Sequence, residues 1–200
     1  PLPSLACATG GLSPEELRSV RRVSIAPVQL PERPSLPRSW SGSAALVGTL
    51  IFLPGGGIAA FHLANLGNDM PLELARHMDE ARIDVAAYLY DEAKAALETR
   101  GITVVPSAEA ADGVLEISVR NYGLSPAAMT GNQYRPDFML YYRLLGADGR
   151  TIWQRQSFLA IERSNLAEFE PRPRDEYLQN PSLLQTSFRR AASIVTASAM

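Results

Sequence analysis

Residues 95–105 read AALETRGITVV, and this stretch decides the fold because it joins the end of a helix directly to a strand. Upstream, apolar residues recur three and four positions apart from Met78 to Leu97, which predicts an amphipathic helix over 75–100. Gly101 supplies the glycine that commonly follows a helix C-terminus. The apolar run Ile102–Val105 then predicts a strand, so the two elements form a compact unit.

Three later segments are predicted strands: Gly113–Arg120, Phe138–Leu145 and Thr151–Ile161. Between the last two, Ala147–Arg150 contains Asp-Gly, which accommodates the positive φ of a tight hairpin turn. The connections are too short for crossovers, so we expect an antiparallel meander.

Two further elements frame this core. A short strand is expected at Val23–Val28, followed by an extended, proline-rich surface segment over 31–43. A last helix over 175–198 is interrupted by Pro181 and begins regularly only at Ser182. The element order predicts an α/β (α+β) two-layer sandwich, in which two helices cover one face of a mixed, mostly antiparallel sheet.

The chain is predicted to contain a tether, residues 1–20, and a single α/β domain, residues 21–200, with an apolar, glycine-rich insertion at 44–67. Residues 44–66 carry no charge, but Pro54 and three glycines after it break any continuous membrane-spanning helix. The insertion is expected to fold on the domain or on a neighbouring copy. The alternatives are an oligomer-forming or membrane-dipping hairpin and a transmembrane helix.

The composition is that of an ordinary globular protein, with 46% hydrophobic and 20% charged residues. Its 19 basic and 21 acidic residues give a formal net charge of -2, without the clustered lysines and arginines that bind nucleic acid. The single cysteine cannot form an intramolecular disulfide. A nucleic-acid partner is therefore not expected.

That cysteine, Cys7, lies in the run Ser4-Leu5-Ala6-Cys7-Ala8. A small residue before cysteine, with leucine before that, is similar to the lipobox at which bacterial signal peptides are cut and the cysteine is acylated. The position three residues before the cysteine, usually aliphatic, is Ser4. Residues 1–6 are too short for a whole signal peptide, so we interpret the chain as truncated upstream. The alternative is a free cysteine in a frayed terminus.

Several short motifs follow one another in a fixed order: Val23–Pro27, the glycine-rich insertion, the stretch 95–105, Ala111–Ile117, Tyr134–Pro136 and Gly149–Trp153. This succession resembles a class of uncharacterised bacterial envelope lipoproteins, from Val23 to about Ile161. The resemblance implies an envelope location, an acylated Cys7 and no known catalytic activity. A more distant resemblance is to auxiliary lipoproteins that form rings around secretion systems.

The sequence shows no catalytic or metal-binding pattern. Its two histidines, His62 and His77, are 15 positions apart without cysteine partners, which gives no metal signature. We interpret His62 as a polar interruption of the insertion and His77 as part of a solvated, salt-linked helix face. No enzyme activity, cofactor or metal is predicted.

Aromatic and arginine residues gather on the predicted meander. Such residues dominate binding hot spots, and the alternative is that alternate members fill the core while the others cover the sheet. Because neighbours in a strand point to opposite faces, either Tyr141 or Tyr142 is expected outside. The candidate contact residues are Tyr122, Tyr134, Arg135, Tyr141, Tyr142 and Trp153.

The sequence thus predicts a non-enzymatic envelope lipoprotein that acts through protein contacts or assembly. Its expected partners are a membrane, through a lipid on Cys7, and an envelope protein or further copies of itself. Its expected location is the outer membrane, facing the periplasm. The alternatives are a periplasmic ligand-binding module that uses the sheet aromatics, and an unrecognised hydrolase.

Overall fold

A mixed sheet forms the centre of the fold. In the computed structural model, which describes residues 20–36, 70–127, 132–159 and 169–200, the strands run in the order β2-β1-β3-β4-β5, and β6 pairs with β4. β1 lies parallel to β2 and β3, whereas β3, β4 and β5 form the expected antiparallel meander. The strands are β1 (Arg22–Ile25), β2 (Thr103–Val104), β3 (Gly113–Pro126), β4 (Gln133–Gly146), β5 (Thr151–Phe158) and β6 (Arg172–Pro173).

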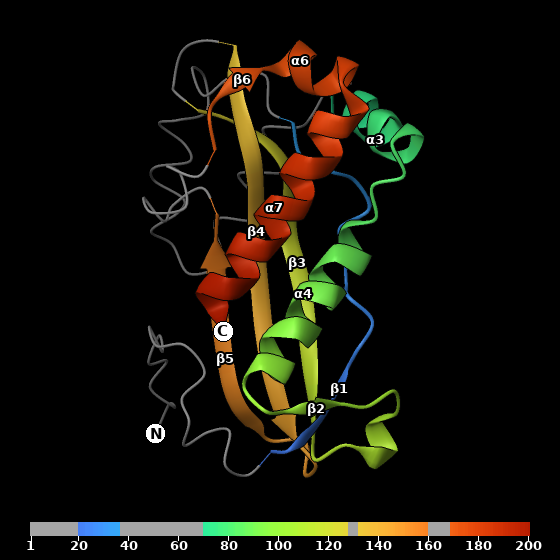
Figure 1. The fold of residues 1–200 in the computed structure, drawn as a ribbon, viewed down its shortest axis with the longest axis vertical. Helices are drawn as coiled ribbons and strands as arrows, with labels where there is room; N and C mark the ends of the chain where they lie inside the picture. Colours follow the sequence, from blue (N-terminus) through green and yellow to red (C-terminus); the bar gives the residue numbers. More distant parts are fainter. Residues whose placement is uncertain (1–19, 37–69, 128–131, 160–168) are drawn as a thin grey trace, which may run out of the picture.

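The helices form the second layer. They are α3 (Met70–Glu80), α4 (Val85–Thr99), α6 (Arg174–Gln179) and α7 (Pro181–Ala199), with a 3-10 turn, η2 (Ala108–Ala110), before β3. Figure 1 shows α4 and α7 crossing the same face of the sheet side by side, with α3 and α6 near one end of α7. The predicted two-layer α+β sandwich with a mixed sheet is therefore confirmed. Across the described ranges, none of the helices combines the length and apolar character needed to cross a membrane.

The predicted single helix over 75–100 is wrong, because two helices occupy this stretch. α3 ends where Arg82 adopts a left-handed φ of 53°, and the Ile83 N–H donates back to the Met78 carbonyl. The carboxylate of Asp84 then accepts a hydrogen bond from the Ala87 N–H at 2.9 Å and caps α4. The apolar periodicity continues across this break.

The predicted interruption of the last helix at Pro181 is correct. Pro181 is the first residue of α7, where the missing N–H of proline costs no helical hydrogen bond. Asn180 precedes it, and its side chain accepts a hydrogen bond from the Leu183 N–H at 3.0 Å. The helix after Pro181 therefore has its own N-cap, and α6 before it is a separate short helix.

The core lies between the helices and every second residue of the central strands. Leu115 and Ile117 of β3 and Leu140 and Leu144 of β4 are each at most 1% exposed. Phe138 of β4 meets Phe188 of α7 edge to face, with ring centroids 5.8 Å apart. This alternation leaves the intervening strand residues on the second face of the sheet.

Residues 26–36 run on from β1 along β3, and their last three residues, 34–36, are buried. The Gln29 N–H donates to the Ile117 carbonyl at 3.0 Å, and the Ser35 N–H donates to the Tyr122 carbonyl at 2.7 Å. Ser35 and Leu36 are buried, so the expected surface segment is wrong at residues 34–36, whereas Glu32 and Arg33 are exposed as expected. Gly123 makes the contact possible, because a Cβ there would lie 1.9 Å from the Ser35 carbonyl oxygen.

Two predicted features lie outside the described residues. These are Cys7, with residues 1–19 of the expected tether, and the insertion at 44–67, which includes His62. Lipidation of Cys7 and the role of the insertion therefore stay predictions.

Candidate interaction surface

The face of the sheet opposite α4 and α7 presents a mixture of charged, polar and apolar side chains. Strand alternation and register assign it cross-strand rows: Glu116 beside Arg143 and Gln154, Ser118 beside Tyr141 and Gln156, and Met139 beside Phe158. We call these eight residues the second face. All are partly or fully exposed, and none of the described helices covers them.

Polar contacts hold the second face in place. The Arg143 guanidinium donates from Nε to the Glu116 carboxylate at 2.7 Å. The Tyr141 hydroxyl donates to Gln154 Oε1 at 2.7 Å, and the Ser118 hydroxyl donates to Gln29 Oε1 at 3.1 Å. Exposed ion pairs of this kind contribute at most about 1 kcal/mol to stability. Their main consequence is an ordered surface.

Four of the six predicted contact residues are buried: Tyr122, Tyr134, Tyr142 and Trp153 are each at most 8% exposed. They occupy the strand positions that point toward the helices, so alternation places them in the core, which corrects their assignment to a surface. Tyr141 lies on the opposite side of β4 from Tyr142 and is partly exposed, as predicted. Arg135 is also partly exposed. A contact role for Tyr141 and Arg135 stays a prediction.

Tyr142, one of the buried tyrosines, joins the sheet to α7. The Tyr142 hydroxyl lies 3.0 Å from Thr196 Oγ1, and burial raises the pKa of this phenol well above its ordinary value. Beside it, the Ser157 hydroxyl donates to the Val195 carbonyl at 3.1 Å and lies 2.9 Å from the Ser198 hydroxyl. The polar side chains of the last turns of α7 are thus satisfied by the sheet beneath them.

A buried carboxyl near the far end of β4 was missed from the sequence. Asp137 is 7% exposed and accepts a hydrogen bond from the Asn121 amide at 3.0 Å. Burial raises its pKa to about 6, against the opposing hydrogen bonds from Asn121 and the Phe138 N–H. Asn121 follows a register shift in β3, and single-sequence patterns do not reveal such bulges.

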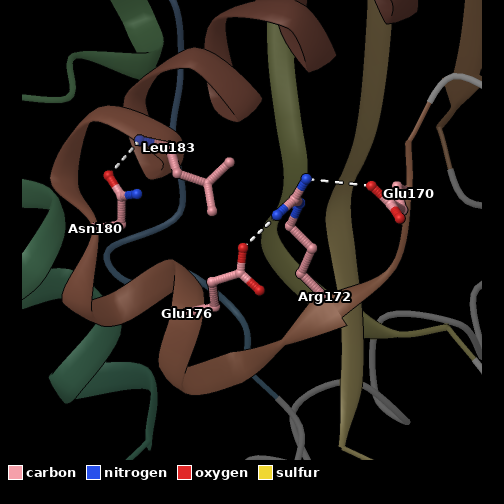
Figure 2. A network of polar contacts seen from close by, with 5 residues as sticks. All are labelled: Glu170, Arg172, Glu176, Asn180 and Leu183. Atoms are coloured by element: carbon pink, nitrogen blue, oxygen red, sulfur yellow. Dashed lines mark hydrogen bonds and ion pairs between the residues drawn. The ribbon is translucent and has the colours of Figure 1, made fainter.

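A charged corner fixes the turn from β6 into α6 (Figure 2). Arg172 lies between two carboxylates and binds Glu176 on one side and Glu170, at 3.1 Å, on the other. The hydrogen bond that Arg172 donates to the Glu176 carboxylate is the main reason that the pKa of Arg172 is raised above its ordinary value. Asn180 caps α7 in the same view. Arg172, Glu170 and Glu176 therefore pair with one another at this corner.

The described residues contain no group of three metal-ligating side chains. His77 Nδ1 lies 3.6 Å from the Glu80 carboxylate on α3, in agreement with the predicted salt-linked face.

No protein-family model matches the chain, and no curated protein does. Among solved structures, it is similar to protein XCC0632 of Xanthomonas campestris, described with family model DUF330, at 15% identity over 88% of this chain and 79% of that chain (TM-score 0.44). It is also similar to the PelC dodecamer of Paraburkholderia phytofirmans, at 9% identity over 96% and 95% (TM-score 0.38). A third is lipoprotein GNA1162 of Neisseria meningitidis, at 15% identity over 74% and 90% (TM-score 0.27).

Proposed function

We propose that this chain is a non-enzymatic lipoprotein of the bacterial cell envelope, held to a membrane through Cys7, and that the second face binds a protein partner or another copy. The observation that carries the proposal is the second face itself. It presents apolar and aromatic groups beside ordered charges, and no described helix covers it. Interfaces combine such groups in this way, with a polar rim around apolar and aromatic contacts.

The position of Cys7 suits an anchor. Residues 8–19 separate it from Val20, the first described residue, which is buried in the core. Twelve residues span at most about 40 Å when extended and about 20 Å as a flexible coil. A lipid on Cys7 therefore keeps the domain near the membrane without entering its fold. We place it in the outer membrane, facing the periplasm.

The anchor is tested by expressing the chain behind a complete signal peptide with labelled fatty acid. We expect label in the wild type and none in Cys7→Ala. Ser4→Leu restores an aliphatic residue three positions before the cysteine, so it should label at least as strongly as wild type. An unlabelled, soluble wild-type product would contradict the anchor.

The contact role is tested by site-specific photo-crosslinking in cells. A crosslinking residue replaces Tyr141 or Gln154 on the second face, and the matched control replaces Asp91, an exposed residue of α4. We expect one defined adduct from the two sheet positions and none from the helix. The size of the adduct separates a second copy from another envelope protein. Equal crosslinking at all three positions, or at none, would exclude the second face as the interface.

A further inference from the structure

Asp137 is buried, and the described part of the chain places no cation in an ion pair with it. Among the described residues, its side-chain hydrogen bond comes from Asn121, and the Phe138 N–H adds one from the backbone. No ion pair reaches it from any described residue. Two neutral donors offset only part of what an ionised carboxylate loses when it leaves water.

A cation with an unsatisfied nitrogen lies on the same strand. Arg135 precedes Asp137 by two residues, so the two side chains share a face of β4 and their Cα atoms lie about 7 Å apart. The Arg135 Nε is buried and makes no hydrogen bond. Ser35 Oγ is likewise buried without a hydrogen-bond partner, and Ser35 meets Gly123, the residue opposite Asp137. The end of β3 and β4 that carries Asp137 therefore also holds Arg135, whose Nε lacks a hydrogen bond, and borders Ser35, whose Oγ lacks one.

We propose that Arg135 and Asp137 form a proton-controlled ion pair. With the proton on Asp137, the two side chains remain separate, as in the structure. When the proton leaves, Arg135 turns toward the carboxylate, and Nε gains the hydrogen bond that it lacks. Local packing at this end of β3 and β4, where residues 29–36 attach, then depends on pH.

Other charged groups do not replace Arg135 in this role. Arg120, in the irregular part of β3, is exposed, and Arg172 of β6 already binds two carboxylates. β5 presents Phe158 at this level, and α7 presents Phe188 to the opposite face. On α6, burial raises the pKa of Tyr177 to about 12, so this phenol is neutral near pH 7.

The direction of the pH effect follows from the two states of the chain. Unfolded, Asp137 has the ordinary pKa of 3.8, whereas in the folded arrangement with Arg135 apart its pKa is about 6. The folded protein then binds this proton more tightly than the unfolded chain. The stability that protonation of Asp137 contributes is complete below about pH 3.8 and is lost as pH rises through about 6. The ion pair opposes that loss by stabilising the carboxylate.

The test follows the Asp137 carboxyl and the Arg135 Nε by NMR between pH 4 and 8, in the full chain and in Arg135→Gln. An opposite charge at close range lowers a carboxyl pKa by about 1 or more. We therefore expect Asp137 to titrate at least about one pH unit lower in wild type than in Arg135→Gln. Between pH 4.5 and 8, the unfolding constant of the variant should rise about 10-fold more than that of wild type.

Two variants serve as controls. Asp137→Asn should remove this part of the pH dependence, and Asp91→Asn, on the exposed side of α4, should leave it unchanged. An equal carboxyl pKa in wild type and Arg135→Gln would overturn the proposal, because a purely structural role of Arg135 changes stability equally at every pH. If Arg135→Gln does not fold, the wild type alone provides the test. An Arg135 Nε resonance that does not shift with pH as Asp137 titrates would refute the ion pair.

Discussion

Replacing Gly123 with alanine should detach the N-terminal segment from the sheet. Gly123 has a φ of +152°, a conformation that L side chains rarely adopt, and its added Cβ would lie 1.9 Å from the Ser35 carbonyl oxygen. A carbon and an oxygen in contact need about 3.3 Å, so the Ser35 backbone must move by more than about 1 Å. That movement breaks the hydrogen bonds from Ser35 N–H to Tyr122 and from Leu124 N–H to Ser35.

The expected loss of stability combines backbone strain at residue 123 with the two broken hydrogen bonds. The strained backbone costs about 1 to 3 kcal/mol, and each lost hydrogen bond about 1 kcal/mol, so Gly123→Ala should lower the free energy of unfolding by about 3 to 5 kcal/mol. Urea denaturation measures the loss, and hydrogen exchange should show weaker protection of the Leu124 amide. Gly149→Ala is the matched control: φ there is +76° but nothing lies within 4 Å of its Cβ, so it should lose only about 1 kcal/mol. A Gly123→Ala loss no larger than that of Gly149→Ala would refute the close-contact argument.

Three other substitutions test local features by urea denaturation. Arg82→Gly should raise the free energy of unfolding by about 0.5 to 1 kcal/mol, because Arg82 holds a left-handed φ of 53°, and a loss would mean that its side chain stabilises the turn. Asn180→Ala should lower it by about 1 kcal/mol through loss of the α7 cap, whereas Asn180→Asp keeps the acceptor and should change it little. Phe188→Ala should lower it by about 3 to 5 kcal/mol, since the ring is fully buried against Phe138, and a loss below about 1 kcal/mol would contradict that packing.

The sequence predicts the meander and its turn because local chemistry determines both. Gly149 has the positive φ that Asp-Gly turns require, and its N–H donates to the Gly146 carbonyl at 2.9 Å. Gly101, with a φ of 77°, ends α4 as expected. The break at Arg82 was missed because apolar periodicity passes through it, while the Asp84 cap is a short-range signal that periodicity does not register.

The candidate surface was only partly predictable. Composition placed aromatic residues on the meander, but which face each one takes depends on register. A register shift in β3 between Val119 and Asn121 changes the face locally, before Tyr122. Alternation along β4 and β5 places Tyr142 and Trp153 in the core and Tyr141 on the second face. The buried Asp137 depends on contacts between distant segments, which no local pattern encodes.

The central place of β1 has a kinetic consequence. Its residue Val23 pairs with Val104 on one side and with Gly113 on the other, so no neighbour of this strand is close to it along the chain. Closing loops of that length is entropically slow, whereas the hairpin of β4 and β5 and the unit of α4 and β2 form from adjacent residues. We therefore expect β1 to pair last during folding, although it precedes the other described strands in the chain. It should insert between β2 and β3 after those two strands have formed.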